Sequence, residues 1–233
     1  IFIAIADPYQ YSPSNAEQKV FKRELPDVKS AFHTMNYQKF YPQTISREQL
    51  RQAFLSPESL ESFITNIITA MYTAMEYDEF LLMKYLLARA ILNGKLYAVQ
   101  TADTSNGITE AIAKEITSDI IATSGAMSYP SPKYNATGVV NNSPVDRQVV
   151  IVSNAFNAKM KVDVLASAFH MEEVDFMAEK IDVDGFGEFD DARLEKLFTN
   201  EDGTRAADYT PFTTAEKTAL NAIPAVVVSR DWF

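Results

Sequence analysis

Residues 56–94, SPESLESFITNIITAMYTAMEYDEFLLMKYLLARAILNG, carry the strongest structural signal in the sequence. Ser56 can accept hydrogen bonds from the first N–H groups of a helix, and Pro57 suits the first helical position. Glycine and proline are absent between Glu58 and Asn93, and Gly94 follows as a typical helix stop. The stretch therefore predicts one helix, a rod of roughly 54 Å at ~1.5 Å per residue.

The first half of this stretch carries a stripe of apolar residues. They recur at spacings of three and four, which places them on one face of a helix: Leu60, Phe63, Ile64, Ile67, Ile68, Met71 and Met75. A helix of this length far exceeds the usual three turns. It is typical of a long supporting helix in an assembly or of a member of a helix bundle. The alternative is a kinked pair of ordinary helices that meet near Glu76–Asp78.

The rest of the chain alternates between strand-like and helix-like segments without strict βαβ order, so the expected fold class is α+β. Strands are predicted at 1–6, 95–100, 147–153 and 223–233, helices at 15–25, 47–55 and 107–127, and helical turns at 163–169 and 172–178. Residues 180–186 suit either a strand or a loop. Residues 128–146 have the composition of a long polar loop, and residues 188–220 that of a charged surface excursion.

Composition excludes several classes of function. The 233 residues carry a net charge of −10 and include no cysteine, so disulfides, thiolate nucleophiles and cysteine-ligated zinc are excluded. The negative charge argues against a surface that neutralises nucleic-acid phosphates or sits on anionic lipid. The most apolar run, Phe80–Leu92, contains Lys84 and Arg89 and is too short to cross a bilayer.

Residues 182–193, DVDGFGEFDDAR, resemble a calcium-binding loop. Asp182, Asp184, Gly187 and Asp190 fall at positions 1, 3, 6 and 9 of such a loop, and Glu188 adds another carboxylate. However, Phe186 at position 5 has no side-chain oxygen, and Arg193 places a cation where a bidentate glutamate is required. An acidic calcium-binding regulatory module is therefore the alternative function, and an acidic turn is the favoured interpretation.

No catalytic, cofactor-binding or metal-binding residue is predicted. His33 and His170 are isolated in the sequence, and no phosphate loop, dinucleotide fingerprint or nucleophile elbow is present. Carboxylates are abundant but lack the defined spacing that acid–base catalysis needs: Glu172, Glu173, Asp175, Glu201 and Asp202. A carboxylate hydrolase is thus only a weak third hypothesis, and the expectation is a protein that is not an enzyme.

Several long blocks of the sequence resemble, in the same order, the major capsid proteins of small tailed phages, especially those of Bacillus-infecting podoviruses. The blocks are AEQKVFKRELPDVKSAFHTMNYQKFYPQTI (16–45), ESFITNIITAMYTAMEYDEFLLMKYLL (61–87), MKVDVLASAFHMEEVDF (160–176), VDGF (183–186) and VVVSRDWF (226–233). Ordered matches of this length are far more specific than a short motif.

The resemblance implies the Hong Kong 97 type of phage capsid fold. Residues 1–12 would be the returning strand of an extended loop. Residues 13–105 would be a peripheral domain containing a spine helix at 58–93. Residues 106–233 would form an axial domain whose C-terminal return is incomplete. The resemblance also implies that the chain is a fragment of a longer protein.

The function implied by the resemblance is that of a structural major capsid protein of a tailed double-stranded DNA phage. It would assemble into the pentamers and hexamers of an icosahedral or prolate head. Its partners would be other copies of itself, a scaffolding protein, the portal vertex and decoration proteins. Packaged DNA would lie close by without specific contact, and neither a cofactor nor a membrane would be involved. The protein would be assembled in the cytoplasm of the bacterial host and would reside in the virion.

Overall fold

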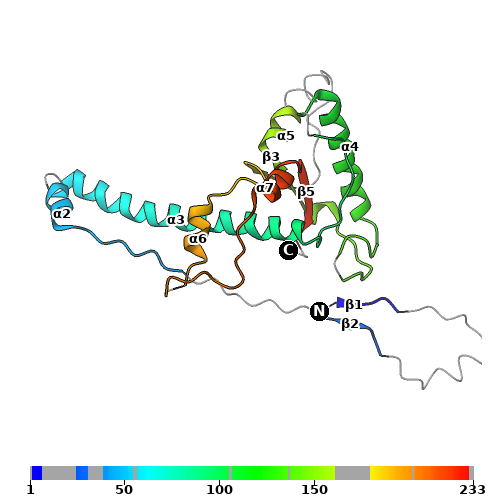
Figure 1. Ribbon diagram of the computed structural model, residues 1–233, viewed down its shortest axis with the longest axis horizontal. Helices are drawn as coiled ribbons and strands as arrows, with labels where there is room; N and C mark the ends of the chain where they lie inside the picture. Colours follow the sequence, from blue (N-terminus) through cyan, green and yellow to red (C-terminus); the bar gives the residue numbers. More distant parts are fainter. Residues whose placement is uncertain are drawn as a thin grey trace, which may run out of the picture.

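The computed structural model describes residues 2–6, 25–30, 39–54, 57–104, 107–135, 137–160, 179–200 and 202–230. They form a mixed arrangement of helices and strands (Figure 1). In chain order the elements are β1 (Phe2–Ile3), β2 (Val28–Lys29), α2 (Arg47–Ala53), α3 (Pro57–Leu92), α4 (Glu110–Met127), the 3-10 turn η1 (Val145–Arg147), β3 (Gln148–Ser153), α5 (Asn154–Lys159), β4 (Glu179–Val183), α6 (Asp191–Leu197), α7 (Thr214–Asn221) and β5 (Ala225–Ser229).

The predicted long helix is confirmed as α3, a single helix of 36 residues. The interpretation as two helices that meet near Glu76–Asp78 is wrong, because the helix is unbroken there. α2 lies beside the beginning of α3, at the end that is farthest from the sheet (Figure 1). Among the described residues, no helix is long and apolar enough to span a membrane.

The main sheet has three strands in the order β4-β3-β5. β3 runs parallel to β4 and antiparallel to β5. Because side chains alternate along a strand, β3 contributes to two separate cores. Val149 and Ile151 face the core shared with α3, whereas Val150 and Val152 face the core shared with α4. The predicted strands at 147–153 and 223–233 are confirmed by β3 and β5.

The larger core joins the second half of α3 to the segment between β4 and β5. Leu81, Leu87 and Ala88 of α3 are buried against that segment and one face of the sheet. The segment contributes Leu194, Leu197, Tyr209, Phe212 and Leu220. The prediction that residues 188–220 form a surface excursion is therefore wrong, since its apolar residues are buried even though charged residues separate them.

The smaller core lies on the other face of the sheet, under α4 and α5. Ala113, Ile116 and Ile120 of α4 pack with Phe156 of α5, which is fully buried. Thr109 caps α4 by accepting a hydrogen bond from the Ile112 N–H. The helix predicted at 107–127 is thus confirmed.

The helix predicted at 47–55 is confirmed, with boundaries that differ by a few residues. α2 has reciprocal caps: the Ser46 hydroxyl accepts from the Gln49 N–H at 3.2 Å, and the Gln49 side chain accepts from the Ser46 N–H at 3.0 Å. The helix predicted at 15–25 falls almost wholly outside the described residues, and the helical turns predicted at 163–169 and 172–178 lie outside them altogether.

The strand predicted at 95–100 is absent, because this segment has no strand partner among the described residues. The strand predicted at 1–6 is reduced to β1, which pairs antiparallel with β2. Figure 1 shows that pair lying apart from the sheet and the long helix. The Lys29 ammonium donates to the Thr137 carbonyl at 2.7 Å and so connects the pair to the loop after α4.

Candidate assembly site on the long helix

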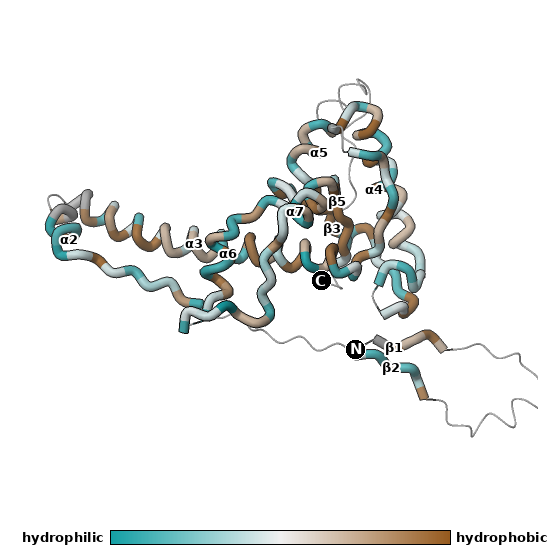
Figure 2. The backbone as a smooth tube through the Cα atoms, viewed as in Figure 1, coloured by the Kyte–Doolittle hydropathy of each residue, from teal (hydrophilic) through white to brown (hydrophobic). Residues whose placement is uncertain are grey.

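The long helix has two halves with different surroundings. We call residues 39–54 and 57–77 the arm, and residues 184–221, which cover the second half of α3, the clamp. Figure 2 shows hydrophobic residues recurring along the whole of α3, including the part that extends away from the sheet beside α2. The contrast between the two halves makes the arm the candidate functional surface.

The boundary between the halves is a buried ion pair at Asp78. The Asp78 side chain is 0% exposed. The Arg193 guanidinium of α6 donates to both of its oxygens, at 2.6 and 2.8 Å, and the Tyr41 hydroxyl donates to one of them at 2.8 Å. This bond to Asp78 raises the pKa of Arg193. The bidentate geometry fixes α6 against one turn of α3 and also connects residue 41 of the arm to it.

Two further cations of α3 hold the clamp beyond that boundary. The buried Lys84 ammonium pairs with Asp184 and donates to the Glu188 carbonyl at 2.6 Å. One turn later, the Arg89 guanidinium donates to the Thr210 carbonyl and lies 4.4 Å from the centre of the Phe212 ring. Three charged side chains of α3, those of Asp78, Lys84 and Arg89, thus bind the clamp at successive points along the helix.

An aromatic cluster around Tyr85 fills the space between these ionic contacts. The Tyr85 ring centre is 5.1 Å from that of Phe198, 5.5 Å from that of Tyr209 and 5.4 Å from that of Phe212. The Thr210 N–H donates to the Tyr85 hydroxyl at 3.2 Å. Burial in this cluster raises the pKa of Tyr209. The side of the second half of α3 that carries Leu81, Tyr85 and Ala88 is therefore buried within the chain, by both apolar and polar partners.

The arm keeps its apolar stripe exposed. Ile64 is 47% exposed, Ile68 45% and Tyr72 61%, and Met75 is also exposed. Leu86 is 61% exposed and lies eleven residues, or about three turns, beyond Met75, on the same face of the helix. Of the predicted stripe, Leu60, Phe63, Ile67 and Met71 are half-buried, whereas Ile64, Ile68 and Met75 are exposed. A row of exposed apolar side chains on one face of a helix is typical of an interaction site.

The opposite face of the arm carries small residues. Together with α6 they line an open groove of about 700 Å³ formed by Asn66, Thr69, Ala70, Thr73, Ala74, Tyr77, Asp190, Ala192, Arg193 and Lys196. The Tyr77 hydroxyl donates to the Asp190 carboxylate at 3.3 Å. Partial burial and the nearby Asp190 carboxylate raise the pKa of Tyr77. The two faces of the arm therefore differ in chemistry: one carries large apolar side chains, and the other carries small and polar ones.

The loop at 182–193 is not arranged as a calcium site. Asp182 accepts from the Asn157 amide at 2.8 Å, and Asp184 pairs with Lys84. Asp190 instead caps α6 by accepting from the Arg193 N–H at 3.0 Å. Arg193, which stands at the position of the missing glutamate, binds Asp78. These carboxylates thus bind separate protein donors and do not converge on one point where a calcium ion could lie.

Of the remaining residues considered from sequence, only Asp202 lies among the described residues. His33, His170, Glu172, Glu173, Asp175 and Glu201 lie outside the described residues. Asp202 accepts hydrogen bonds from Thr204, which lower its pKa. Within the described ranges, no group of three or more histidine, aspartate or glutamate side chains can hold a metal ion.

Sequence reasoning missed the ionic contacts of the clamp, although a signal for them exists. Lys84 and Arg89 interrupt the apolar run Phe80–Leu92, and charged residues are almost never fully buried unless they are paired. Each of them therefore called for an acceptor elsewhere in the chain. The sequence does not identify these acceptors, because Asp184 and the Thr210 carbonyl lie about a hundred residues or more away.

Comparison with known proteins identifies the family. The model of the Phi29-like phage major capsid protein family matches residues 1–233. The major capsid protein of Bacillus phage B103 is 37% identical over 190 residues, which are 80% of this chain and 41% of that protein. The major capsid protein of Bacillus phage PZA is 35% identical over 204 residues, which are 87% of this chain and 44% of that protein. The chain thus spans less than half the length of these relatives.

A solved structure shows the same fold. A chain from the capsid structure of Staphylococcus phage Andhra has a TM-score of 0.55 at 13% sequence identity, and the match covers 98% of this chain and 63% of that chain. At this identity the likeness concerns the fold alone. The family match extends over every residue of the sequence, and the resemblance inferred from the ordered sequence blocks is confirmed. The chain belongs to the Phi29-like phage major capsid protein family, a family of structural proteins.

Proposed function

We propose that this chain forms part of the shell of a tailed double-stranded DNA phage head, in which copies assemble as pentamers and hexamers of an icosahedral or prolate capsid. The proposal includes the Hong Kong 97 type of fold. It assigns residues 1–12 to an extended loop, 13–105 to a peripheral domain with α3 as its spine helix, and 106–233 to an axial domain. The family membership and the likeness to a solved capsid chain support it.

The observation that carries the proposal is the exposed apolar stripe of the arm. Fully burying an exposed isoleucine side chain contributes about 1.5–3 kcal/mol, and a half-exposed side chain contributes correspondingly less. Ile64, Ile68 and Tyr72 are three partly exposed side chains on one face of a long helix. A helix that is held rigidly at one end and is apolar at the other is suited to reach a neighbouring subunit.

The partner that we propose for this stripe is the β1–β2 pair of a second copy. Ile3, Ile5, Leu25 and Val28 of that pair and its flanks are exposed large hydrophobic residues. Each copy then carries both an apolar extension and an apolar helix face. Two different surfaces that bind each other form a heterologous contact, which generates closed rings when the rotation closes. This is the geometry needed for pentamers and hexamers.

The charge of the chain agrees with this role. A net charge of −10 gives no general attraction for DNA, so packaged DNA can lie along such a wall without binding tightly. Assembly in the host cytoplasm, residence in the virion, and contacts with scaffolding, portal and decoration proteins belong to the same proposal.

The proposal is tested by placing a negative charge on the apolar stripe. Ile64→Glu and Ile68→Glu are introduced separately into the full-length polypeptide and compared with Ser62→Glu. All three side chains are exposed on α3, and glutamate is a good helix former, so each variant subunit is expected to fold. Ser62 lies about 160° around the helix from Ile64 and about 120° from Ile68, which makes it a matched control for added charge away from the stripe.

Electron microscopy and sedimentation give the readout. We expect closed shells from the unmodified protein and from Ser62→Glu, and dispersed subunits from the two isoleucine variants. The far-ultraviolet circular dichroism of all four proteins is expected to be the same. Normal shells from both isoleucine variants would show that the stripe is not an assembly contact.

A further inference from the structure

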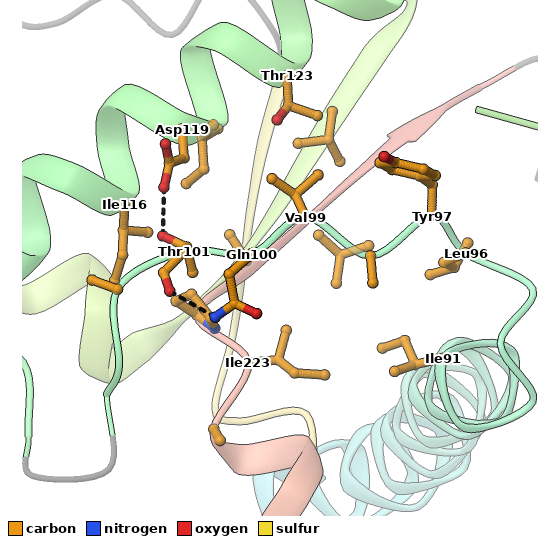
Figure 3. Close-up of a pocket in the computed structure, with 18 of the residues that line it drawn as sticks. Ile91, Leu96, Tyr97, Val99, Gln100, Thr101, Ile116, Asp119, Thr123 and Ile223 are labelled. Atoms are coloured by element: carbon orange, nitrogen blue, oxygen red, sulfur yellow. Dashed lines mark hydrogen bonds between the residues drawn. The ribbon is translucent and has the colours of Figure 1, made fainter. Parts of the chain in front are cut away.

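A cavity of about 760 Å³ lies between β5, α4 and the chain that follows α3 (Figure 3). Its walls include Leu96–Thr101 on one side and Pro224–Val227 on the other, with α4 between them. Thr104 closes one end by donating to the Ala222 carbonyl at 3.0 Å. The cavity is therefore bordered by two stretches of chain that are extended or strand-like.

The wall formed by β5 presents the outer edge of the sheet. The strand order β4-β3-β5 places β5 at the edge. The Ser153 N–H donates to the Pro224 carbonyl, and the Arg230 N–H donates to the Arg147 carbonyl, both at 2.9 Å. Given the antiparallel register and the alternation of bonded pairs, Val226 and Val228 direct their backbone groups toward β3. Ala225 and Val227 direct theirs away from it, toward the cavity.

The opposite wall is a segment with strand composition but no strand. Leu96–Thr101 contains Tyr97, Val99 and Thr101, residue types that favour strands. No described backbone group pairs with this segment, which is why the strand predicted at 95–100 is absent. The outer edge of β5 and the segment Leu96–Thr101 therefore both line the cavity. Neither has a neighbouring strand among the described residues to pair with its backbone N–H and C=O groups.

Several polar groups in the cavity are already bonded to the protein. The Thr101 hydroxyl donates to the Asp119 carboxylate at 2.7 Å, and the Gln100 amide donates to the Thr101 carbonyl at 3.2 Å; Figure 3 shows both contacts. The other labelled side chains around the space are mainly apolar, among them Ile91, Val99, Ile116 and Ile223. A small polar ligand would find few convergent side-chain partners here, whereas an extended peptide would find backbone groups.

We infer that this cavity binds an additional β-strand. The strand is supplied by the part of the same capsid polypeptide that lies outside these 233 residues. The strand would pair with the outer edge of β5 through the backbone groups of Ala225 and Val227. Its alternate side chains would face α4 and α3, so an apolar, β-branched segment fits. The relatives and the solved capsid chain both extend well beyond the match, so chain is available to supply it.

The test measures backbone amide exchange at single-residue resolution in shells of the full-length polypeptide. Two amides, those of Val226 and Val228, are bonded inside the sheet and serve as internal controls. If a strand fills the cavity, the amides of Ala225 and Val227 exchange within about 10-fold of these controls. If the edge is open, they exchange roughly 100-fold faster or more, which would overturn the inference. The shells form in either case, so this failure is distinct from a failure of the proposed assembly function.

A second measurement distinguishes an inserted strand from collapse of the two walls onto each other. The chain has no cysteine, so Val227→Cys can be combined with Tyr97→Cys, Val99→Cys or Thr101→Cys in turn. With a strand inserted, the two walls are two strand spacings apart, roughly 9.5 Å, which exceeds the ~7 Å limit for a disulfide. We expect no disulfide in any of the three pairs under oxidation. Rapid formation of one would show that the walls pair directly, and the inference would fail.

Discussion

The two halves of α3 are made of similar residues but have opposite surroundings. Leu87 in the clamped half is 1% exposed, whereas Ile64 and Tyr72 in the arm are 47% and 61% exposed. The difference comes from what lies beside each half. The clamped half is covered by a distant part of the same chain, through Asp78–Arg193, Lys84–Asp184 and the rings around Tyr85. The helical part of the arm, residues 57–77, has α2 and residues 39–46 beside it, and α6 borders only the side that faces away from the apolar stripe.

Apolar periodicity therefore shows which face of a helix is buried but not by which molecule. A single cooperative helix can satisfy half of its apolar face within the chain and leave the other half for assembly. The continuous hydrogen bonding of α3 keeps the arm helical without local cover, since propagation of a helix is easier than its nucleation.

The largest effect is expected when the boundary between the halves is broken. Arg193→Met removes the guanidinium and leaves the Asp78 carboxylate buried without its cation, bonded to the Tyr41 hydroxyl; breaking a buried ion pair in this way typically costs about 3–5 kcal/mol. We expect a loss of this size in the free energy of unfolding of the unassembled subunit, measured by urea denaturation. Lys196→Met, an exposed position on the same helix, is the control and is expected to change stability by at most about 0.5 kcal/mol. Similar stabilities for both variants would contradict the structural role of the ion pair.

The next largest effect compares two adjacent leucines. Leu87→Ala removes a fully buried side chain and is expected to destabilise the subunit by about 2–5 kcal/mol. Leu86→Ala removes a side chain that is 61% exposed and is expected to alter stability by less than about 0.5 kcal/mol. In shells the order of sensitivity changes, because Leu86 extends the apolar stripe: we expect Leu86→Ala to lower the yield of shells while the subunit stays stable. Equal losses of subunit stability would refute the assignment of the two faces.

A glycine inside the clamp tests how closely its parts are packed. A Cβ atom at Gly187 would lie 2.2 Å from the Lys217 carbonyl oxygen, so Gly187→Ala forces the backbone apart and is expected to cost about 1–3 kcal/mol. At Gly125 in α4, a Cβ atom would meet nothing within 4 Å. Gly125→Ala is therefore expected to stabilise the subunit by roughly 0.5–1 kcal/mol. Thermal unfolding of both variants measures these opposite signs, and a neutral Gly187→Ala would show that the clamp is looser than described.

The smallest effect is the dependence on pH of one cap in the clamp. Hydrogen bonds from Thr213 to the Glu216 carboxylate lower the pKa of Glu216 below its ordinary value of 4.5. The carboxylate therefore stabilises the folded state above pH 4.5, and this contribution is lost as the pH falls through the lowered pKa. We expect Glu216→Gln to be slightly less stable than the unmodified protein at pH 7, and the difference to shrink at pH 3. Urea midpoints at both pH values measure this, and a constant difference would argue against the assignment.

Much of the fold was predictable because its longest elements carry strong local signals. α3 has a proline start and a glycine stop, α4 has a regular apolar period, and β3 and β5 are apolar runs. The clamp was not predictable in this way. Its buried residues, such as Leu194, Tyr209 and Phe212, are separated by charges, and only contact with α3 explains their burial. The strand predicted at 95–100 failed for the same physical reason, since a strand exists only with a partner.

The candidate assembly site was half predictable. The spacing of Ile64, Ile68 and Met75 identifies the apolar face, but the sequence cannot show that this face remains uncovered while the next turns are buried. That depends on Asp78 and Arg193, which are brought together across 115 positions of the chain.

The most direct test of the account is an electron cryomicroscopy reconstruction of shells assembled from the full-length polypeptide, at a resolution that separates side chains. We predict density from a second copy over the stripe formed by Ile64, Ile68 and Tyr72, while the clamp of the same copy covers the second half of α3. A reconstruction in which this stripe faces solvent, or is covered only by residues of its own copy, would contradict the central claim.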